Sequence, residues 1–247
     1  MEFSDSLINE FQPFKKVVVL TGAGISAESG IPTFRGEDGL WRRYRVEELA
    51  TPYAFQTNPK LVWEWYDWRR GIITEAEPNP GHTAIAEMEQ IFPHFFLITQ
   101  NVDGLHRRAG NTKIIEIHGN LWQLRCVREG KVREDYRVPL PEIPPRCECG
   151  ALLRPHVVWF GESLDKGDLA RSYRLIEECD LLLVVGTSAV VQPVASFPLM
   201  AKRQGAFVVE VNKDPTSISS TVDESLIGKA GEILPALLGR VKKHRGK

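Results

Sequence analysis

Short runs of consecutive apolar residues constrain the fold of this chain most strongly. A strand that is apolar on both faces is typical of a parallel sheet covered by helices on each side. The runs alternate with helical patterns, of which Gly81–Gln90 and Asp168–Cys179 are the clearest. The sequence therefore predicts an α/β fold with a doubly wound parallel sheet. The predicted strands are Val17–Leu20, Phe95–Ile98, Ile114–Ile117, Leu181–Val185 and Phe207–Val211.

Two stretches interrupt this alternation and predict a smaller second lobe. Residues 36–76 are rich in tryptophan and helical in pattern, without an intervening strand. Residues 120–162 hold three cysteines and many prolines, which exclude long helices and central strands. We expect a single domain, 1–247, in which a helical module and a zinc-ribbon-like module form an inserted smaller lobe. The expected limits are approximately 1–35, 77–119 and 163–247 for the larger lobe, and 36–76 and 120–162 for the smaller lobe.

The charge balance and the cysteine content exclude several classes of protein. The 247 residues carry 31 basic and 32 acidic side chains, so the formal charge is −1. This balance predicts no direct nucleic-acid partner and no membrane partner. No apolar stretch reaches the roughly 18 residues that a membrane helix needs, and the start of the chain is polar. Four cysteines make no disulfide framework, so we expect a cytoplasmic protein with a solvated basic end at 242–247.

A glycine-rich loop follows the first predicted strand. It contains the pattern G-x-G-x-x-A, one form of the dinucleotide fingerprint. In that pattern Gly22 permits a tight turn, Gly24 lets the backbone approach a pyrophosphate, and Ala27 lets the next helix pack on the strand. The acidic ribose ligand expected about 20 residues later is missing, because residues 30–36 form a loop. Either a dinucleotide binds differently here than in dehydrogenases, or the loop is a turn without a ligand.

Polar side chains follow two further predicted strands. Asn101 and Asp103 come after Phe95–Ile98, and His118 comes after Ile114–Ile117. Because ligands bind outside the carboxyl ends of strands in open α/β sheets, these side chains are candidates for one crevice. An amide, a carboxylate and an imidazole suit orientation and proton transfer. The alternative is structural: Asn101 and Asp103 would be turn residues, and His118 a half-buried histidine.

Five segments are distributed along the chain: TGAGISAESGIPTFR (21–35), TQNVD (99–103), IHG (117–119), LRPHVVWFGE (153–162) and GTS (186–188). Together these segments resemble the sirtuin family of NAD-dependent protein-lysine deacylases. They follow the family's order over nearly the whole chain, from about residue 14 to about residue 231, which makes the resemblance specific. The resemblance implies a Rossmann-like sheet in the larger lobe.

The resemblance also implies where NAD binds and which residues are catalytic. It assigns the pyrophosphate to residues 22–24, the nicotinamide and its ribose to residues 100–103, and the adenosine side to residues 186–188. His118 is the implied general base, and Asn101 is the implied second catalytic residue. The implied NAD contacts are Gly22, Ala23, Gly24, Ser26, Phe34, Arg35, Gln100, Asn101, Asp103, Gly186, Thr187, Ser188, Asn212, Lys213, Asp214 and Ala230.

The implied reaction consumes NAD and does not reduce it. The acyl group moves from lysine to ADP-ribose, and the products are nicotinamide, free lysine and O-acyl-ADP-ribose. His118 takes a proton from a ribose hydroxyl in this scheme, which suits a base with a pKa near 7. Acylated-lysine proteins are the implied partners, and we expect their backbone to pair with an extended segment at 158–162. Val158 and Phe160 would then face the acyl-lysine stem, although both would equally suit the core.

Tyr66 and Arg69 bear on which acyl group is removed. They lie three residues apart in a helical pattern, Asn58–Ile73, and so share a face. The pair resembles the Y-x-x-R signature of sirtuins that accept acidic acyl groups, and a guanidinium with a phenol suits a succinyl or malonyl carboxylate. We therefore expect desuccinylase or demalonylase activity beside deacetylase activity. The alternative is a surface arginine beside a packed tyrosine, and the adjacent Arg70 leaves the register open.

The cysteines depart from the two C-x-x-C pairs that bind structural zinc in the family. Glu129 stands where the second cysteine of the first pair belongs, and the second pair is shortened to Cys147 and Cys149. Cys126, Cys147 and Cys149 with Glu129 or water would still hold zinc tetrahedrally. Alternatively, the site is empty and prolines hold the loop. Cys179 belongs to a separate predicted helix and is expected to be buried.

Two other functions remain compatible with these residues. A mono-ADP-ribosyltransferase on the same scaffold would transfer ADP-ribose to protein. A non-catalytic module would bind acyl-lysine or NAD without turnover, which leaves His118 and Asn101 without a purpose. A conventional dehydrogenase is disfavoured because the acidic ribose ligand is missing.

Overall fold

A parallel sheet of six strands forms the centre of the computed structural model, which describes residues 2–35 and 39–245. The strands are β1 (Val17–Thr21), β2 (Phe95–Thr99), β3 (Ile114–Glu116), β7 (Leu181–Val185), β8 (Phe207–Asn212) and β9 (Glu224–Ile227). Their order is β3-β2-β1-β7-β8-β9, and every neighbouring pair is parallel. This order confirms the predicted doubly wound, Rossmann-like sheet, in which the direction of winding reverses between β1 and β7.

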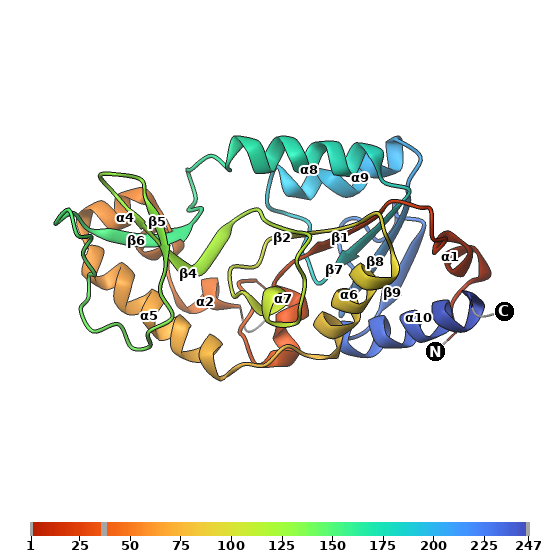
Figure 1. The fold of residues 1–247 in the computed structure, drawn as a ribbon, viewed down its shortest axis with the longest axis horizontal. Helices are drawn as coiled ribbons and strands as arrows, with labels where there is room; N and C mark the ends of the chain where they lie inside the picture. Colours follow the sequence, from red (N-terminus) through yellow and green to blue (C-terminus); the bar gives the residue numbers. More distant parts are fainter. Residues whose placement is uncertain (1, 36–38, 246–247) are drawn as a thin grey trace.

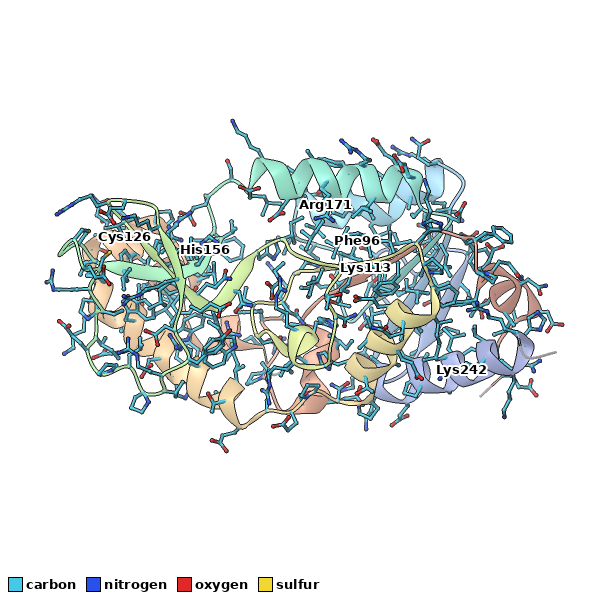
Figure 2. All side chains as sticks on the ribbon, in the orientation of Figure 1. Phe96, Lys113, Cys126, His156, Arg171 and Lys242 are labelled. Atoms are coloured by element: carbon cyan, nitrogen blue, oxygen red, sulfur yellow. The ribbon has the colours of Figure 1, made fainter. Side chains whose placement is uncertain are left out.

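Helices cover both faces of this sheet (Figure 1). They are α1 (Asp5–Glu10), α6 (Pro80–Ile91), α8 (Lys166–Glu178), α9 (Phe197–Arg203) and α10 (Ala230–Arg245). Val17 of β1 lies in the core against α1, α6 and α10, whereas the next residue, Val18, lies in the core against α8 and α9. On the α8 face, the Arg171 guanidinium lies 4.4 Å from the ring centroid of Phe96 in β2 (Figure 2).

A second group of elements packs around its own core at one end of the molecule (Figure 1). Its helices are α2 (Leu40–Arg43), α3 (Val46–Leu49), α4 (Pro52–Thr57) and α5 (Pro59–Glu75). Its antiparallel sheet has the order β5-β4-β6, with β4 (Gly119–Cys126), β5 (Val132–Glu134) and β6 (Leu153–Val157). Pro155 lies in the edge strand β6, where a missing backbone N–H is tolerated. We propose that these elements form the smaller lobe, with the limits expected from the sequence.

The structure differs from the sequence expectations after β1 and at one edge of the sheet. The element after β1 is a 3₁₀-helix, η1 (Ala23–Ser29), whose buried residues are Ile25 and Ser26. Ala27 is exposed, so the expectation that it packs the helix on the strand is wrong. The edge strand β9 was not predicted, because Glu224–Ile227 is only half-buried and lacks a continuous apolar run.

Two short elements complete the fold: α7 (Leu105–Arg108) and the 3₁₀-helix η2 (Val194–Ser196). None of the helices in residues 2–35 and 39–245 combines the length and the apolar character that crossing a bilayer requires.

Candidate functional site

Three loops meet where the winding of the sheet reverses. Thr21, Thr99 and Val185 end β1, β2 and β7 at the same level of the sheet. The loops that follow contact each other, since the Gly24 N–H donates to the Gly186 carbonyl over 2.7 Å. The Gln100 side-chain amide donates to the Thr187 hydroxyl over 3.0 Å. This edge is where open α/β sheets bind their ligands.

The two glycines of the fingerprint allow close packing within the protein. A Cβ atom on Gly22 would lie 2.8 Å from the Gly186 carbonyl oxygen, and one on Gly24 would lie 2.7 Å from it. Gly186 itself has a φ of +60°, and its Cβ would lie 2.4 Å from the Ile25 nitrogen. The fingerprint pattern predicts that Gly24 lets the backbone approach a pyrophosphate. The structure adds a second reason, because only glycine lets η1 approach the end of β7 this closely.

Ser26 connects the two polar residues that follow β2. Its hydroxyl donates to Asp103 Oδ2 over 2.8 Å and accepts from Asn101 Nδ2 over 3.1 Å. All three side chains are buried, and burial raises the pKa of Asp103 above its ordinary value. Since the amide nitrogen of Asn101 is directed at Ser26, its carbonyl oxygen is directed elsewhere. The structure thus brings together three residues that sequence reasoning placed in one site.

The buried side chain of His82 contacts Ser26, and this residue was not predicted from the sequence. The backbone N–H of Asn79 donates to His82 Nδ1 over 3.3 Å, so His82 Nε2 carries the hydrogen that faces Ser26 Oγ at 3.4 Å. Burial lowers the pKa of His82 to about 4, which keeps the ring neutral. The signal for its position was available: Asn79 followed by Pro80 is a helix start, and His82 is the third residue of that helix.

A second buried histidine lies against His82. The two rings are 4.8 Å apart, and His106 Nε2 lies 3.0 Å from the Thr21 hydroxyl. The Thr21 hydroxyl donates to Thr99 Oγ1, so the hydrogen in the contact with His106 comes from the ring. Burial holds the pKa of His106 well below its ordinary value. Both histidines are therefore neutral, and they hold Ser26 and Thr21 in place by hydrogen bonds.

His118 has one ring nitrogen occupied and one available. Its Nδ1 lies 3.2 Å from the Gln100 carbonyl oxygen, which can only accept, so Nδ1 carries the hydrogen. Nε2 then holds a lone pair. Burial lowers the pKa of His118 below 6.5, so the ring is neutral near pH 7 and able to take a proton.

Tyr66 and Arg69 reach the same region from α5 and are both buried, with 4% of each exposed. The Arg69 guanidinium lies 4.5 Å from the ring centroid of Phe34 and 5.2 Å from that of Trp65. Burial lowers the pKa of Arg69, and its electrostatic interactions with Tyr66 and Asp103 oppose this effect. Within 2–35 and 39–245, no carboxylate lies at ion-pair distance from Arg69. Because Arg69 is buried, the alternative of a surface arginine beside a packed tyrosine is wrong.

Arg70 has a structural role, which distinguishes it from its neighbour Arg69 as a candidate partner of Tyr66. Its guanidinium donates to the backbone carbonyls of Asp135 and Arg137, and it lies 3.7 Å from the Asp135 carboxylate. It is fully buried on the side of α5 that faces the small sheet. Arg69, and not Arg70, is therefore the cation near the polar cluster.

The segment predicted to bind peptide is extended only as far as Trp159, because Phe160 and Gly161 form a turn. The Val158 N–H donates to the His118 carbonyl over 2.9 Å, and the Phe160 N–H donates to the Ala50 carbonyl over 3.0 Å. The expectation of an extended strand through residue 162 is therefore wrong. Val158 is half-buried, and Phe160 is 43% exposed.

The remaining predicted NAD contacts lie around the edge of this region. Thr187 is buried, and its carbonyl accepts from the Asn212 side chain over 2.9 Å. Ala230 is buried at the start of α10, beside Gly231, whose N–H donates to Glu28 over 2.9 Å. Ala23 and Gln100 are half-buried. The exposed positions in this set are Arg35, Ser188, Lys213 and Asp214.

Three cysteines and one glutamate form a separate cluster in the smaller lobe. Ligand atoms of Cys126, Glu129, Cys147 and Cys149 all lie within 4.8 Å of one another. The backbone N–H of Glu129 donates to the Cys126 sulfur and lowers the pKa of that thiol to about 7. Three sulfurs and a carboxylate at this spacing fit a tetrahedral zinc ion. Cys179 is buried at the end of α8, as expected, and burial raises its pKa to about 12.

Comparison with known proteins decides the family. The model of the Sir2 family matches residues 22–193, which include the loops after β1, β2, β3 and β7 but not those after β8 and β9. The chain belongs to the Sir2 family. This membership confirms the resemblance to sirtuins.

Sir2 relatives with curated names match almost the whole chain. It is 57% identical over 231 residues to the NAD-dependent protein deacylase of Aquifex aeolicus, which covers 93% of this chain and 97% of the relative. It is 49% identical over 240 residues to NAD-dependent protein deacylase 1 of Archaeoglobus fulgidus, which covers 97% and 98%.

Solved Sir2 structures share the fold. An ADP-ribose complex of a Sir2 homologue carrying a serine-to-alanine mutation has a TM-score of 0.94 at 47% identity, covering 99% of this chain and 98% of that chain. A Sir2 homologue in complex with NAD has a TM-score of 0.91 at 47% identity, covering 98% and 95%. A Sir2 protein bound to a myristoylated histone peptide has a TM-score of 0.75 at 36% identity, covering 93% and 92%.

Proposed function

We propose that this chain removes acyl groups from protein lysines in an NAD-dependent reaction. The observation that carries the proposal is the geometry of His118, whose Nδ1 is held by the Gln100 carbonyl and whose Nε2 is left as a neutral base. Relatives at up to 57% identity are named NAD-dependent protein deacylases, which supports the same activity. A mono-ADP-ribosyltransferase or a non-catalytic module finds no such support.

The polar edge of the sheet supplies the binding site in this proposal. NAD, when bound, supplies the ribose that receives the acyl group and loses nicotinamide. Ser26 holds Asn101 and Asp103 so that the Asn101 carbonyl oxygen and the Asp103 carboxylate keep fixed directions. Fixed dipoles in a buried site stabilise developing charge better than mobile water does. Phe34 and Trp65, beside Arg69, exclude water that would otherwise hydrolyse the reacting sugar.

His118 acts as the general base. Its neutral Nε2 accepts a proton from a ribose hydroxyl, and its Nδ1–H remains on the Gln100 carbonyl throughout. The resulting imidazolium is stabilised because that carbonyl oxygen faces the charged ring. No metal ligand takes part, since the cysteine cluster belongs to the smaller lobe.

The peptide substrate lies along residues 158–160 in this proposal. The N–H groups of Val158 and Phe160 are already used inside the protein, so a substrate backbone would pair with carbonyl groups of this segment. Val158 and the partly exposed Phe160 would contact the aliphatic stem of the acyl-lysine. The Sir2 structure with a myristoylated histone peptide supports acylated-lysine peptides as partners.

Acidic acyl groups are part of the proposed substrate range. Arg69 is a buried cation with no carboxylate partner among the described residues, and Tyr66 lies one helical turn away on the same side of α5. Burying an unpaired charge is unfavourable unless a ligand supplies the opposite charge. A succinyl or malonyl carboxylate would supply it. Acetyl groups would bind without this contact, so we propose deacetylation as well.

Zinc and location complete the proposal. Cys126, Cys147, Cys149 and Glu129 would hold one zinc ion that stabilises the smaller lobe and takes no part in catalysis. We place the chain in the cytoplasm, because its four cysteines form no disulfide framework, which suits a reducing compartment.

The activity is tested with His118→Ala. Wild-type chain, NAD and an acetyl-lysine peptide should give deacetylated peptide and O-acetyl-ADP-ribose in the mass spectrum. His118→Ala should lower the rate by about 10²- to 10⁴-fold, the usual contribution of a general base. The buried network is untouched, so thermal unfolding should be unchanged. Full activity of the variant would contradict the role of His118.

The acyl range is tested with Arg69→Met. This variant keeps an unbranched, buried side chain but removes the cation. It should selectively lose desuccinylation by about tenfold or more while deacetylation is retained, since charge-assisted bonds contribute about 1.5–3 kcal/mol. Equal loss of both activities would count against the acidic-acyl pocket.

A further inference from the structure

The indole of Trp159 links the peptide segment to the helix that carries Tyr66. Its Nε1–H donates to the Tyr66 hydroxyl over 2.9 Å, although the two residues are 93 positions apart in the sequence. Trp159 is 3% exposed and Tyr66 is 4% exposed, so water does not compete for this bond. An indole N–H can only donate. The Tyr66 oxygen therefore accepts, and its own hydrogen must be directed away from Trp159.

Arg154 and Glu162 hold the indole in place. The Arg154 guanidinium lies 3.5 Å from the ring centroid of Trp159. It donates two hydrogen bonds to the Glu162 carboxylate, of 2.6 and 2.8 Å, and Glu162 also accepts the backbone N–H of Trp159 over 2.9 Å. Phe55 packs 5.3 Å from the indole. A bidentate ion pair fixes the orientation of the guanidinium as well as its distance. Because this guanidinium packs on the indole, the Trp159 N–H stays directed at Tyr66.

The Tyr66 phenol and the Arg69 guanidinium lie three residues apart in α5 and interact electrostatically. Burial is the main cause that raises the pKa of Tyr66, to about 12, and the Arg69 charge partly opposes it. The phenol therefore keeps its hydrogen at every pH at which the protein works. A hydrogen-bond donor and a guanidinium that has no carboxylate partner among the described residues lie on one helical turn. Together they match the two oxygens of a carboxylate.

We propose that Trp159 is a positioning residue for acyl specificity: by occupying the acceptor side of the Tyr66 hydroxyl, its indole N–H directs that hydroxyl's hydrogen toward the carboxylate of an acidic acyl-lysine. The proposal rests on the role of Tyr66 and Arg69 proposed above. Trp159 does not touch the carboxylate. Without its N–H, the Tyr66 hydroxyl is free to rotate and present a lone pair, which repels a carboxylate.

The test removes the N–H and keeps the ring. Trp159 is replaced by 3-benzothienylalanine, in which sulfur takes the place of the N–H group, and Trp159→Phe is made as the encoded version. For a succinyl-lysine peptide KM should rise by about three- to tenfold, the usual loss for one hydrogen bond. The matched acetyl-lysine peptide reports any disturbance of the peptide segment itself, so the ratio of the succinyl KM to the acetyl KM should rise by that factor. In a Tyr66→Phe background the replacement should have no further effect on the succinyl KM.

The failure of this proposal can be told apart from failure of the acyl pocket. An unchanged succinyl KM, or an equal rise of both KM values, overturns the role of Trp159, while Arg69→Met still reports on the pocket. A wild-type chain without desuccinylase activity overturns both.

The contact itself is tested without substrate by the indole ¹H–¹⁵N resonance of Trp159, which should move in Tyr66→Phe. An unmoved resonance contradicts the hydrogen bond.

Discussion

At the scale of single residues, hydrogen-bond direction determines what this site can do. The Gln100 carbonyl places the hydrogen of His118 on Nδ1, and the Asn79 N–H places the hydrogen of His82 on Nε2. His82 then faces Ser26, whose single hydrogen goes to Asp103. Each assignment follows from a partner that can only donate or only accept. The neutral base and the direction of the Asn101 amide are thus set by buried neighbours.

The pH dependence of activity follows from the environment of His118. Burial lowers the pKa of His118 from its ordinary value, and the ring must lose its proton before it can act, so the neutral form predominates near neutral pH. We expect kcat/KM to fall on the acid side with a midpoint below 6.5 and to be flat from neutral pH upward until another group titrates. A midpoint above 7 would contradict a buried base. The measurement is the pH profile with an acetyl-lysine peptide, which lacks an ionising acyl group.

Ser26→Ala tests the network beneath the site. The change removes the donor to Asp103 and the acceptor for Asn101, so both side chains lose their fixed directions. We expect kcat/KM to fall by about 10- to 100-fold, as small misplacements of positioned groups do. Ser217→Ala, at an exposed position, is the control and should be silent. Equal activity of the two variants would show that the direction of Asn101 does not matter.

At the scale of elements, the packing of η1 on the end of β7 places the polar loops. Gly24 and Gly186 approach so closely that a Cβ on either would meet backbone atoms within 2.7 Å. Neither element can shift alone, because the Gly24 N–H is bonded to the Gly186 carbonyl. The position of Ser26 therefore depends on this contact.

Two alanine substitutions with opposite expected effects test this packing. Gly24→Ala should weaken NAD binding and lower the free energy of unfolding, because the new methyl group meets backbone. Gly71→Ala is the matched control: it lies inside α5 with no atom within 4 Å of its Cβ. That change should stabilise the chain by about 0.5–1 kcal/mol. Thermal unfolding with and without NAD measures both, and a neutral Gly24→Ala would refute the packing argument.

The sequence was most informative where burial is two-sided. The strands β1, β2, β7 and β8 were predicted within one residue, because strands covered on both faces must be continuously apolar. The edge strand β9 was missed, since it is paired on one side and only half-buried. Local patterns also predicted α5 and placed Tyr66 and Arg69 on one face.

At the scale of the whole molecule, contacts across the chain complete the candidate site. Tyr66 meets Trp159, and Ser26 meets both Asn101 and Asp103, although they are separated by 75 to 93 positions. Such pairs leave no local pattern, so the sequence alone did not reveal the Trp159 bond. His82 was missed for a different reason, because the helix start at Asn79 and Pro80 was not used to place it. The cysteine cluster also depends on contacts between distant parts of the chain, because the pairing of β4 with β6 brings Glu129 close to Cys147 and Cys149.

Metal content tests the cluster. We expect about one zinc per chain, and Cys149→Ser should lose it and lower the unfolding temperature, because a structural zinc contributes folding free energy. Cys179→Ser, at a buried thiol outside the cluster, should keep the zinc. Metal analysis by mass spectrometry gives the answer. Equal zinc content in both variants would exclude the cluster as the zinc site.

The central claim is that cleavage of NAD and release of the lysine are one coupled reaction. The most direct measurement is the product balance in a single quenched mixture of chain, NAD and acetyl-lysine peptide. We expect equal amounts of nicotinamide, deacetylated peptide and O-acetyl-ADP-ribose at every time point. Free acetate formed without loss of NAD, or a peptide whose mass has increased by ADP-ribose, would contradict the claim.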